Sequence, residues 1–359
     1  MSLPMRCGAI ILSVLWLGSA ACDRTPEARS DPKPSAPAAA APSAAAAPAA
    51  PEKSAPSAAS FRLPSRARLV AIGDIHGDLA ALRAALRLAG AIDGDDRWVG
   101  KDLTVVQVGD QVDRGDQDRE VLDVLEKLEG EARKSESELI VLNGNHELMN
   151  AALDFRYVTA KSFASFHDHA QRAPATAERL PNEERGRAAA FAPGGPYALK
   201  LSRHLTVAVV GDSLFAHAGV LPTHVDYGLS RINEQASAFL AGRLGQLPKV
   251  VADNDGPIWT RFYGEPEVDG EVCQVLERVL KQVGVRRLVV GHTVQESGIS
   301  GACQQRMFRI DVGLSAYYGN NPTQVLEIAG GRSRILTAGK AGGADKSGAR
   351  PSPELHSAP

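Results

Sequence analysis

Residues 73–78 read Gly-Asp-Ile-His-Gly-Asp, and this stretch decides the fold because it couples a buried strand to a polar turn. The residues before it, 67–72, read Ala-Arg-Leu-Val-Ala-Ile, a run whose length and apolar character predict a buried strand. The glycines at both ends of the motif allow the backbone to turn sharply. One aspartate and one histidine after a strand are most often only a turn, so the rest of the chain must decide their role.

Four further polar clusters follow apolar, strand-like runs along the chain. They are Gly109–Gly115 (GDQVDRG), Gly144–Glu147 (GNHE), His217–Gly219 (HAG) and Gly291–Thr293 (GHT). Charged and imidazole groups at the ends of buried strands are costly unless something satisfies them. Packing alone does not explain five such clusters, whereas bound metal does.

The donor types of these clusters narrow the choice of metal. Carboxylate, amide and imidazole groups without thiolates suit manganese, iron or zinc, and we expect two divalent ions, with manganese first and iron or zinc as alternatives. The expected ligands are Asp74, His76 and Asp110 for one ion, and Asp110, Asn145, His217 and His292 for the other. Two ions about 3.5–4 Å apart, bridged by Asp110, would clamp an in-line displacement at phosphorus and activate the water between them as nucleophile.

The pattern of apolar residues predicts a layered α/β or α+β domain. Strands are expected at 67–74, 103–110, 138–145, 205–212, 213–219 and 287–293, and amphipathic helices at 79–88, 121–128 and 272–280. Residues 150–200 are polar, helical and rich in loops, which indicates an insertion between core strands. That insertion would either cover a site as a cap or decorate the surface.

The two ends of the chain are expected to lie outside the folded unit. Residues 1–22 combine Arg6, an apolar stretch and small residues before Cys22, which is typical of a secretory signal. Cys22 resembles the lipidated cysteine of bacterial lipoproteins, although Ser19 replaces the usual leucine and an ordinary signal peptidase could cut there. Residues 23–60 form an Ala/Pro/Ser-rich linker and 339–359 a similar tail, both expected to be disordered.

Composition excludes several function classes. The chain has 359 residues, a formal net charge of −2 and 44% apolar residues, so residues 61–338 are ample for a large core. A nucleic-acid partner is not expected, because such proteins usually carry a basic excess. Four cysteines without a CxxC spacing give no indication of a zinc–thiolate site. In an oxidising compartment Cys273 and Cys303 could pair, but their spacing leaves both a disulfide and two free thiols open.

The five motifs together resemble the calcineurin-like metallophosphatase superfamily, and more narrowly its phosphoprotein phosphatase branch. The arginine of DRG and the GNHE motif indicate this branch, and so does Val294, where many phosphodiesterase relatives carry a second histidine. Residues 257–264 and 308–319 resemble the bacterial Shewanella-like protein phosphatases. The similarity spans most of residues 66–320.

This resemblance implies a calcineurin-like fold, with a central β-sandwich flanked by helices and the site across the strand ends. It assigns the same six residues named above as ligands of two metal ions. His146 matches the general acid and Asp113 the carboxylate that orients it, a pairing that makes chemical sense because the carboxylate fixes the ring and raises its pKa. Arg114 and Arg261 match the arginines that grip phosphate, for which a planar guanidinium is well suited.

The sequence therefore predicts an exported enzyme, periplasmic and anchored to a membrane by lipid on Cys22. It would hydrolyse phosphate esters of proteins or peptides with the help of two metal ions. One alternative is a hydrolase of small phosphate compounds such as dinucleotide polyphosphates, because the hydrolases of such compounds share the GDxHG and GNHE motifs. A less favoured alternative is a binding protein that keeps the fold without catalysis.

Overall fold

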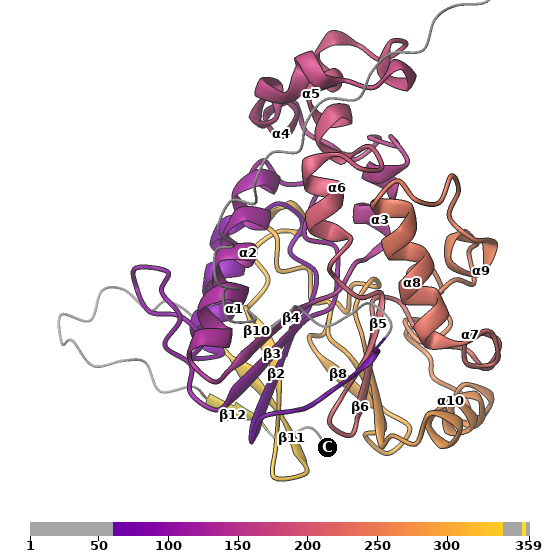
Figure 1. Cartoon of the computed structure of the whole chain (residues 1–359). Helices are drawn as coiled ribbons and strands as arrows, with labels where there is room; N and C mark the ends of the chain where they lie inside the picture. The colour runs from indigo at the N-terminus through magenta and orange to yellow at the C-terminus, as the bar shows by residue number, and fades with distance from the viewer. Residues whose placement is uncertain (1–59, 340–353, 357–359) are drawn as a thin grey trace, which may run out of the picture. The chain divides into compact units, whose positions relative to one another are not determined.

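The computed structural model describes residues 60–339 and 354–356, which form two mixed β-sheets flanked by helices (Figure 1). One sheet has the order β1-β5-β6-β7-β9-β8, and the other β12-β11-β10-β2-β3-β4. The strands of the first sheet are β1 (Arg62–Leu63), β5 (Val207–Val210), β6 (Ser213–Ala216), β7 (Arg287–Val290), β8 (Ser300–Ala302) and β9 (Met307–Arg309). Those of the second are β2 (Arg68–Ile72), β3 (Leu103–Gln107), β4 (Glu138–Val141), β10 (Gln324–Ala329), β11 (Arg332–Thr337) and β12 (Glu354–His356).

Parallel pairing in both sheets explains why the polar motifs meet. Strands β2, β3 and β4 run parallel, and so do β6, β7 and β9. The carboxyl ends of parallel strands lie at the same edge of a sheet. Each predicted strand is present, but it ends several residues before the predicted end. The residues that follow it do not pair with a neighbouring strand and form the turns that carry the polar groups.

The inner strands of the first sheet, β5, β6, β7 and β9, are buried on both faces. One face packs against the other sheet and the other against helices. In β5, Ala208 and Val210 belong to the core between the sheets, whereas Val207 and Val209 belong to a second core on the opposite face. This alternation follows from the two-residue period of a strand. The second core is closed by the helices α7 (Pro222–Tyr227), α8 (Leu229–Leu240), α9 (Lys249–Ala252) and α10 (Gly270–Val283).

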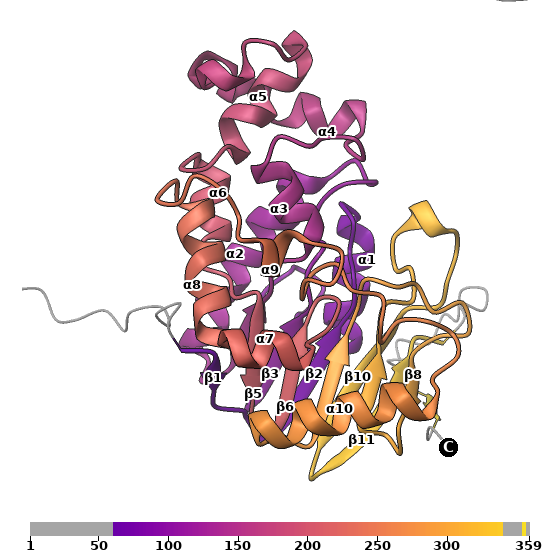
Figure 2. The same ribbon diagram turned by 90° about the vertical axis from the view of Figure 1, so that its right-hand side faces the viewer.

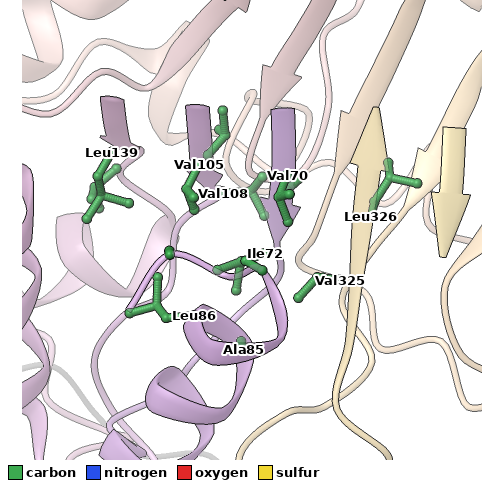
Figure 3. Close-up of a cluster of buried hydrophobic side chains, with 14 of the residues drawn as sticks. Val70, Ile72, Ala85, Leu86, Val105, Val108, Leu139, Val325 and Leu326 are labelled. Atoms are coloured by element: carbon green, nitrogen blue, oxygen red, sulfur yellow. The ribbon is translucent and has the colours of Figure 1, made fainter. Parts of the chain in front are cut away.

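The outer face of the second sheet is covered by α1 (Leu79–Leu88) and α2 (Asp118–Lys134), on the side of the sheets away from α8 and α10 (Figures 1 and 2). Figure 3 shows buried side chains of α1, β2, β3, β4 and β10, which belong to the hydrophobic core around the second sheet. Asp78 caps the start of α1 by accepting a hydrogen bond from the Ala81 amide. The prediction of a β-sandwich flanked by helices is thereby confirmed.

Residues 150–200, predicted as an insertion, are helical and lie between β4 and β5. The elements of this region are α3 (Asn145–Ala151), α4 (Ala160–Ser165), the 3₁₀ helices η1 (His167–Arg172) and η2 (Ala175–Ala177), α5 (Asn182–Phe191) and α6 (Pro196–Leu201). Helices α4 and α5 stand together at one end of the ribbon in both views (Figures 1 and 2). A last 3₁₀ turn, η3 (Ala316–Tyr318), lies between β9 and β10.

Cys273 of α10 and Cys303, in the turn after β8, form a disulfide, with their Cα atoms 5.4 Å apart. The predicted signal, Cys22 and almost all of the linker lie outside the described residues, as does most of the tail. Within residues 339–359, Glu354–His356 forms β12 and pairs antiparallel with β11. In the described part of the chain, no helix has the length and apolar character that crossing a bilayer requires.

Candidate active site

Asp110 lies at the centre of the site, because the imidazoles of three histidines converge on its Oδ2. The Nε2 atoms are 3.3 Å away for His217 and 3.7 Å away for both His76 and His146. Each histidine follows a different strand, β6, β2 and β4 respectively. All four residues are buried, so turns from both sheets bring their polar groups into one protected place.

Two of these histidines are held in a form suited to binding metal. His76 Nδ1 lies 3.2 Å from the Val112 carbonyl oxygen, and His217 Nδ1 lies 3.1 Å from that of Val108. A carbonyl oxygen only accepts, so each Nδ1 carries a proton, and Nε2 is the ring nitrogen that each histidine turns toward the cluster. A backbone acceptor behind the imidazole is the usual way in which proteins orient a ligating histidine.

The Nε2 atom of His217 faces further polar atoms. It lies 2.9 Å from Asn145 Oδ1 and 3.1 Å from His292 Nδ1, and Asp74 accepts a hydrogen bond from the His292 amide at 3.1 Å. The Nε2 atom of His292 is buried and has no hydrogen-bond partner. Buried acceptors that crowd one another in this way are costly unless a cation lies among them.

Among residues 60–339, two groups of three potential ligands stand close enough to hold a metal, and Asp110 belongs to both. One group adds His76 and His146, and the other adds His217 and His292. These groups hold four of the six predicted ligands. The other two lie beside them, with Asp74 Oδ2 4.0 Å from His76 Nε2 and Asn145 Oδ1 2.9 Å from His217 Nε2. The nitrogen and oxygen donors of all six fit divalent manganese, iron or zinc.

The electrostatics of the cluster also fit a cation. Burial, followed by Asp311 and Asp110, holds the pKa of Asp74 well above its usual range. Burial would also raise the pKa of Asp110, but the neighbouring imidazoles, led by His217, hold it well below that range. Burial and the nearby His217 lower the pKa of His292 to about 3, which keeps this ring neutral. Divalent ions would offset the repulsion between the carboxylates.

Glu147 holds the turns of the site together. Its carboxylate accepts hydrogen bonds from the backbone amides of Gly144, Asp110, Gln111 and Val112, at 2.7–3.3 Å. This single side chain therefore fixes the turn after β4 against the turn after β3. Glycine is required beside it, because a Cβ at Gly144 would lie 2.2 Å from Asp110 Oδ1.

Backbone strain concentrates at the same place. The non-glycine site residues with a left-handed backbone are His76, Asp110, Asp113, Arg114 and His292, with φ between 49° and 72°. Such conformations cost energy and persist only where the surroundings enforce them. These backbone conformations therefore cost free energy, which the packing of the core must offset.

His146 forms a hydrogen-bonded pair with Asp113, with 2.7 Å between His146 Nδ1 and Asp113 Oδ2. Burial alone would lower the pKa of His146, but Asp110 and Asp113 outweigh it and raise that pKa. The pair leaves Nε2 of the imidazole pointing toward Asp110 and the metal ligands. This arrangement suits a group that keeps a proton near neutral pH and delivers it into the site.

The predicted phosphate-gripping arginines lie at the edge of the cluster. Arg114 Nη1 is 3.2 Å from His76 Nε2, and its guanidinium is flanked by the rings of Tyr157, Tyr317 and Tyr318 at 5.3–5.7 Å. Arg261 is exposed and donates to Thr293 Oγ1 at 3.2 Å, next to His292. Both arginines can therefore reach an anion that is bound at the metal ligands.

Two further residues belong to the site although the sequence assigned them no role in it. Asp311, which follows β9, is buried beside Asp74, and burial raises its pKa to about 6. It sits in a segment that resembled a known family, and that resemblance was the only signal. Arg187 of α5 is fully buried against Asp113. Nothing in its polar sequence context marked it.

Comparison with known proteins agrees with the site. Residues 67–296 match the family described as calcineurin-like phosphoesterase. The chain is 39% identical over 298 residues to Shewanella-like protein phosphatase 2 of Arabidopsis thaliana, covering 74% of this chain and 76% of the relative. It is 30% identical over 271 residues to Shewanella-like protein phosphatase 1 of Plasmodium berghei, covering 73% and 71%.

Among solved structures, the chain resembles the cold-active protein tyrosine phosphatase of a psychrophilic Shewanella species. The TM-score is 0.60 at 24% identity, and the match covers 77% of this chain and 79% of that one. At this identity the likeness shows the shared fold.

Replacing His146 separates a proton donor from a metal ligand. His146→Asn should lower the turnover of phosphate esters by about 10²–10⁴-fold, the usual contribution of general acid catalysis. The metal content, measured by mass spectrometry of the purified protein, should stay at the wild-type value. Loss of one metal equivalent in the variant would show that His146 is a ligand.

Proposed function

This chain belongs to the calcineurin-like phosphoesterase family and is a phosphoester hydrolase, and from that premise we propose that its substrates are phosphorylated proteins or peptides. The observation that carries the hydrolytic part of this proposal is the His146–Asp113 pair, which lies beside a buried ligand cluster and close to Arg114. The proposed general acid His146, the metal ligands and the phosphate-binding Arg114 then lie in one site. A binding protein without catalysis would need none of this arrangement.

The residues of the cluster would hold two divalent ions, for which we propose manganese. The ligands would be Asp74, His76, Asp110, Asn145, His217 and His292. When bound, the ions would supply charge stabilisation and a nucleophile at neutral pH. The turns of Glu147 and its neighbours hold the ligands in place before substrate arrives, so little reorganisation is needed.

The protein's own side chains would do the rest of the work on the phosphate group. Arg114 and Arg261 would bind and orient its oxygens through their planar forks. His146 would hold a proton at Nε2, directed into the site, and release it to the oxygen that leaves phosphorus. Asp113 keeps the ring in the required orientation through Nδ1.

The edge of the site supports a protein or peptide as substrate. Tyr157 and Tyr317 are exposed by 40% and 63%, and with Tyr318 they surround Arg114. Exposed rings beside a phosphate-binding group offer stacking surfaces to a peptide and to an aromatic leaving group. We therefore expect phosphotyrosine peptides to be the best substrates. The curated relatives that bear the name protein phosphatase support the same class.

We also propose export to the periplasm, with a lipid anchor on Cys22. The signal-like sequence of residues 1–22 supports this location. The disulfide between Cys273 and Cys303 is independent support, because such bonds persist mainly in oxidising compartments. The linker of residues 23–60 would then separate the enzyme from the membrane surface.

A substrate panel tests the proposed activity. Metal-stripped protein, with and without added Mn²⁺, should release phosphate from matched phosphoserine, phosphothreonine and phosphotyrosine peptides only when the metal is present, and fastest from phosphotyrosine. A dinucleotide polyphosphate should be cleaved more slowly. The Asp110→Asn variant, purified in parallel, controls for contaminating phosphatases.

Cleavage of the dinucleotide alone would leave the metal site standing and overturn the substrate class. Release from every peptide without metal would contradict the proposal that divalent ions take part.

Fractionation of cells tests the anchor. The wild-type protein should sediment with membranes, and Cys22→Ser should move it to the soluble fraction, because the attachment point for lipid is lost. Cys7→Ser is the matched control and should stay with the membranes. A wild-type protein that is already soluble would refute the lipoprotein proposal.

A further inference from the structure

Arg187, on helix α5 of the insertion, is a fully buried arginine that reaches the carboxylate behind His146. Its Nη2 atom lies 3.0 Å from Asp113 Oδ1 and 2.7 Å from Asp118 Oδ2. Its other donors bond Asn150 Oδ1 at 2.6 Å and Ser162 Oγ at 2.7 Å. A guanidinium with all its sides used in this way has one fixed orientation.

The two oxygens of Asp113 are divided between different partners. Oδ2 accepts from His146 Nδ1 at 2.7 Å, whereas Oδ1 accepts from Arg187 Nη2 at 3.0 Å and from Asn150 Nδ2 at 2.9 Å. Because the donors on Oδ1 prevent rotation of the carboxylate, they also fix the direction of Oδ2. The ring of His146 therefore depends on contacts one step away from it.

The charges make Arg187 the stronger of the two restraints on Oδ1. Asp113 and Asp118 are both fully buried, and Arg187 bridges them. Burial raises the pKa of Asp118, Arg187 opposes that rise, and Asp113 adds to it. The rings of Phe166 and Phe191 flank the guanidinium at 5.3 and 4.7 Å and keep water away, which strengthens the ion pairs.

We propose that Arg187 is a positioning residue of the phosphatase reaction, which acts through Asp113 on the proton donor His146. This inference rests on the proposed function. When the bond between phosphorus and the leaving oxygen breaks, that oxygen takes the Nε2 proton of His146. The nucleophilic water supplies the new oxygen on phosphorus, and the proton that it loses is returned to His146 through solvent. The insertion of residues 150–200 is thus part of the proton-delivery apparatus, in addition to any covering role.

This role predicts a dependence on the leaving group that a purely structural role does not. Phenolate is a strong base and needs a proton as it departs, whereas 4-nitrophenolate is stable as an anion. Loss of His146 alignment should therefore slow phenyl phosphate hydrolysis much more than 4-nitrophenyl phosphate hydrolysis. General loss of folded or metal-loaded enzyme would slow both esters equally.

The experiment compares kcat/KM for the two esters in wild type, Arg187→Met and Arg187→Lys, with Mn²⁺ present. We expect Arg187→Met to lose about tenfold or more on phenyl phosphate and less than about threefold on 4-nitrophenyl phosphate, as for partial loss of a general acid. Arg187→Lys retains the buried positive charge and should recover part of the phenyl phosphate rate. Thermal unfolding and metal content are measured on every variant.

The matched control is Arg119→Met. Arg119 also anchors the insertion, through Ser165 and Asp168, but no contact joins it to Asp113. It should leave the ratio of the two rates at the wild-type value. In the double variant, Arg187→Met with His146→Asn, kcat/KM for phenyl phosphate should fall by less than about threefold relative to His146→Asn alone. The effects of two residues that act as a unit do not add.

Equal losses on both esters in Arg187→Met, or an equal change of ratio in Arg119→Met, would overturn the proposal. If Arg187→Met does not fold, Arg187→Lys decides, and equal losses on the two esters in that variant would also overturn it. A wild-type protein that releases phosphate neither from these esters nor from the phosphopeptides would instead contradict the proposed function, so the two failures are distinguishable.

Discussion

The rest of the structure depends on the convergence of imidazoles on the buried Asp110, whose Oδ2 lies 3.3–3.7 Å from three histidine nitrogens. Buried polar groups at this density would be unstable on a flexible support. The support here is rigid, because parallel strands of two packed sheets end at the same place. Glu147 then joins the turns through their backbone amides. The fold and the site therefore depend on each other, because the packed core holds the strained turns that carry the predicted ligands.

Much of this arrangement could be predicted from the sequence, because each motif carries its own local signal. An apolar run followed by glycine and a polar group marks the end of a buried strand, and the predicted strands and ligand positions follow from it. The pairing of Cys273 with Cys303 could not be predicted, since spacing along the chain does not show nearness in space. Strands β10 and β11 were also not predicted, because the predicted strands were recognised by the polar motifs at their ends and no such motif follows these two.

Arg187 was missed for a different physical reason. A charged residue in a polar helical segment is normally exposed, and only the fold shows that α5 carries this one against two buried carboxylates. The same contact changes the meaning of the insertion. Its sequence suggested either a cap or a surface decoration, whereas its buried arginine links it to the His146–Asp113 pair. Local patterns thus mark the candidate ligands, while the groups that orient the side chains of the site become visible only in three dimensions.

The central claim is that Asp110 is shared between two metal ions. Anomalous diffraction from crystals soaked in Mn²⁺ tests it most directly, since it locates the metal without reference to activity. The account predicts two peaks about 3.5–4 Å apart, on either side of the Asp110 carboxylate, one beside His76 and the other beside His217 and His292. A single peak, or peaks that do not contact Asp110, would contradict it.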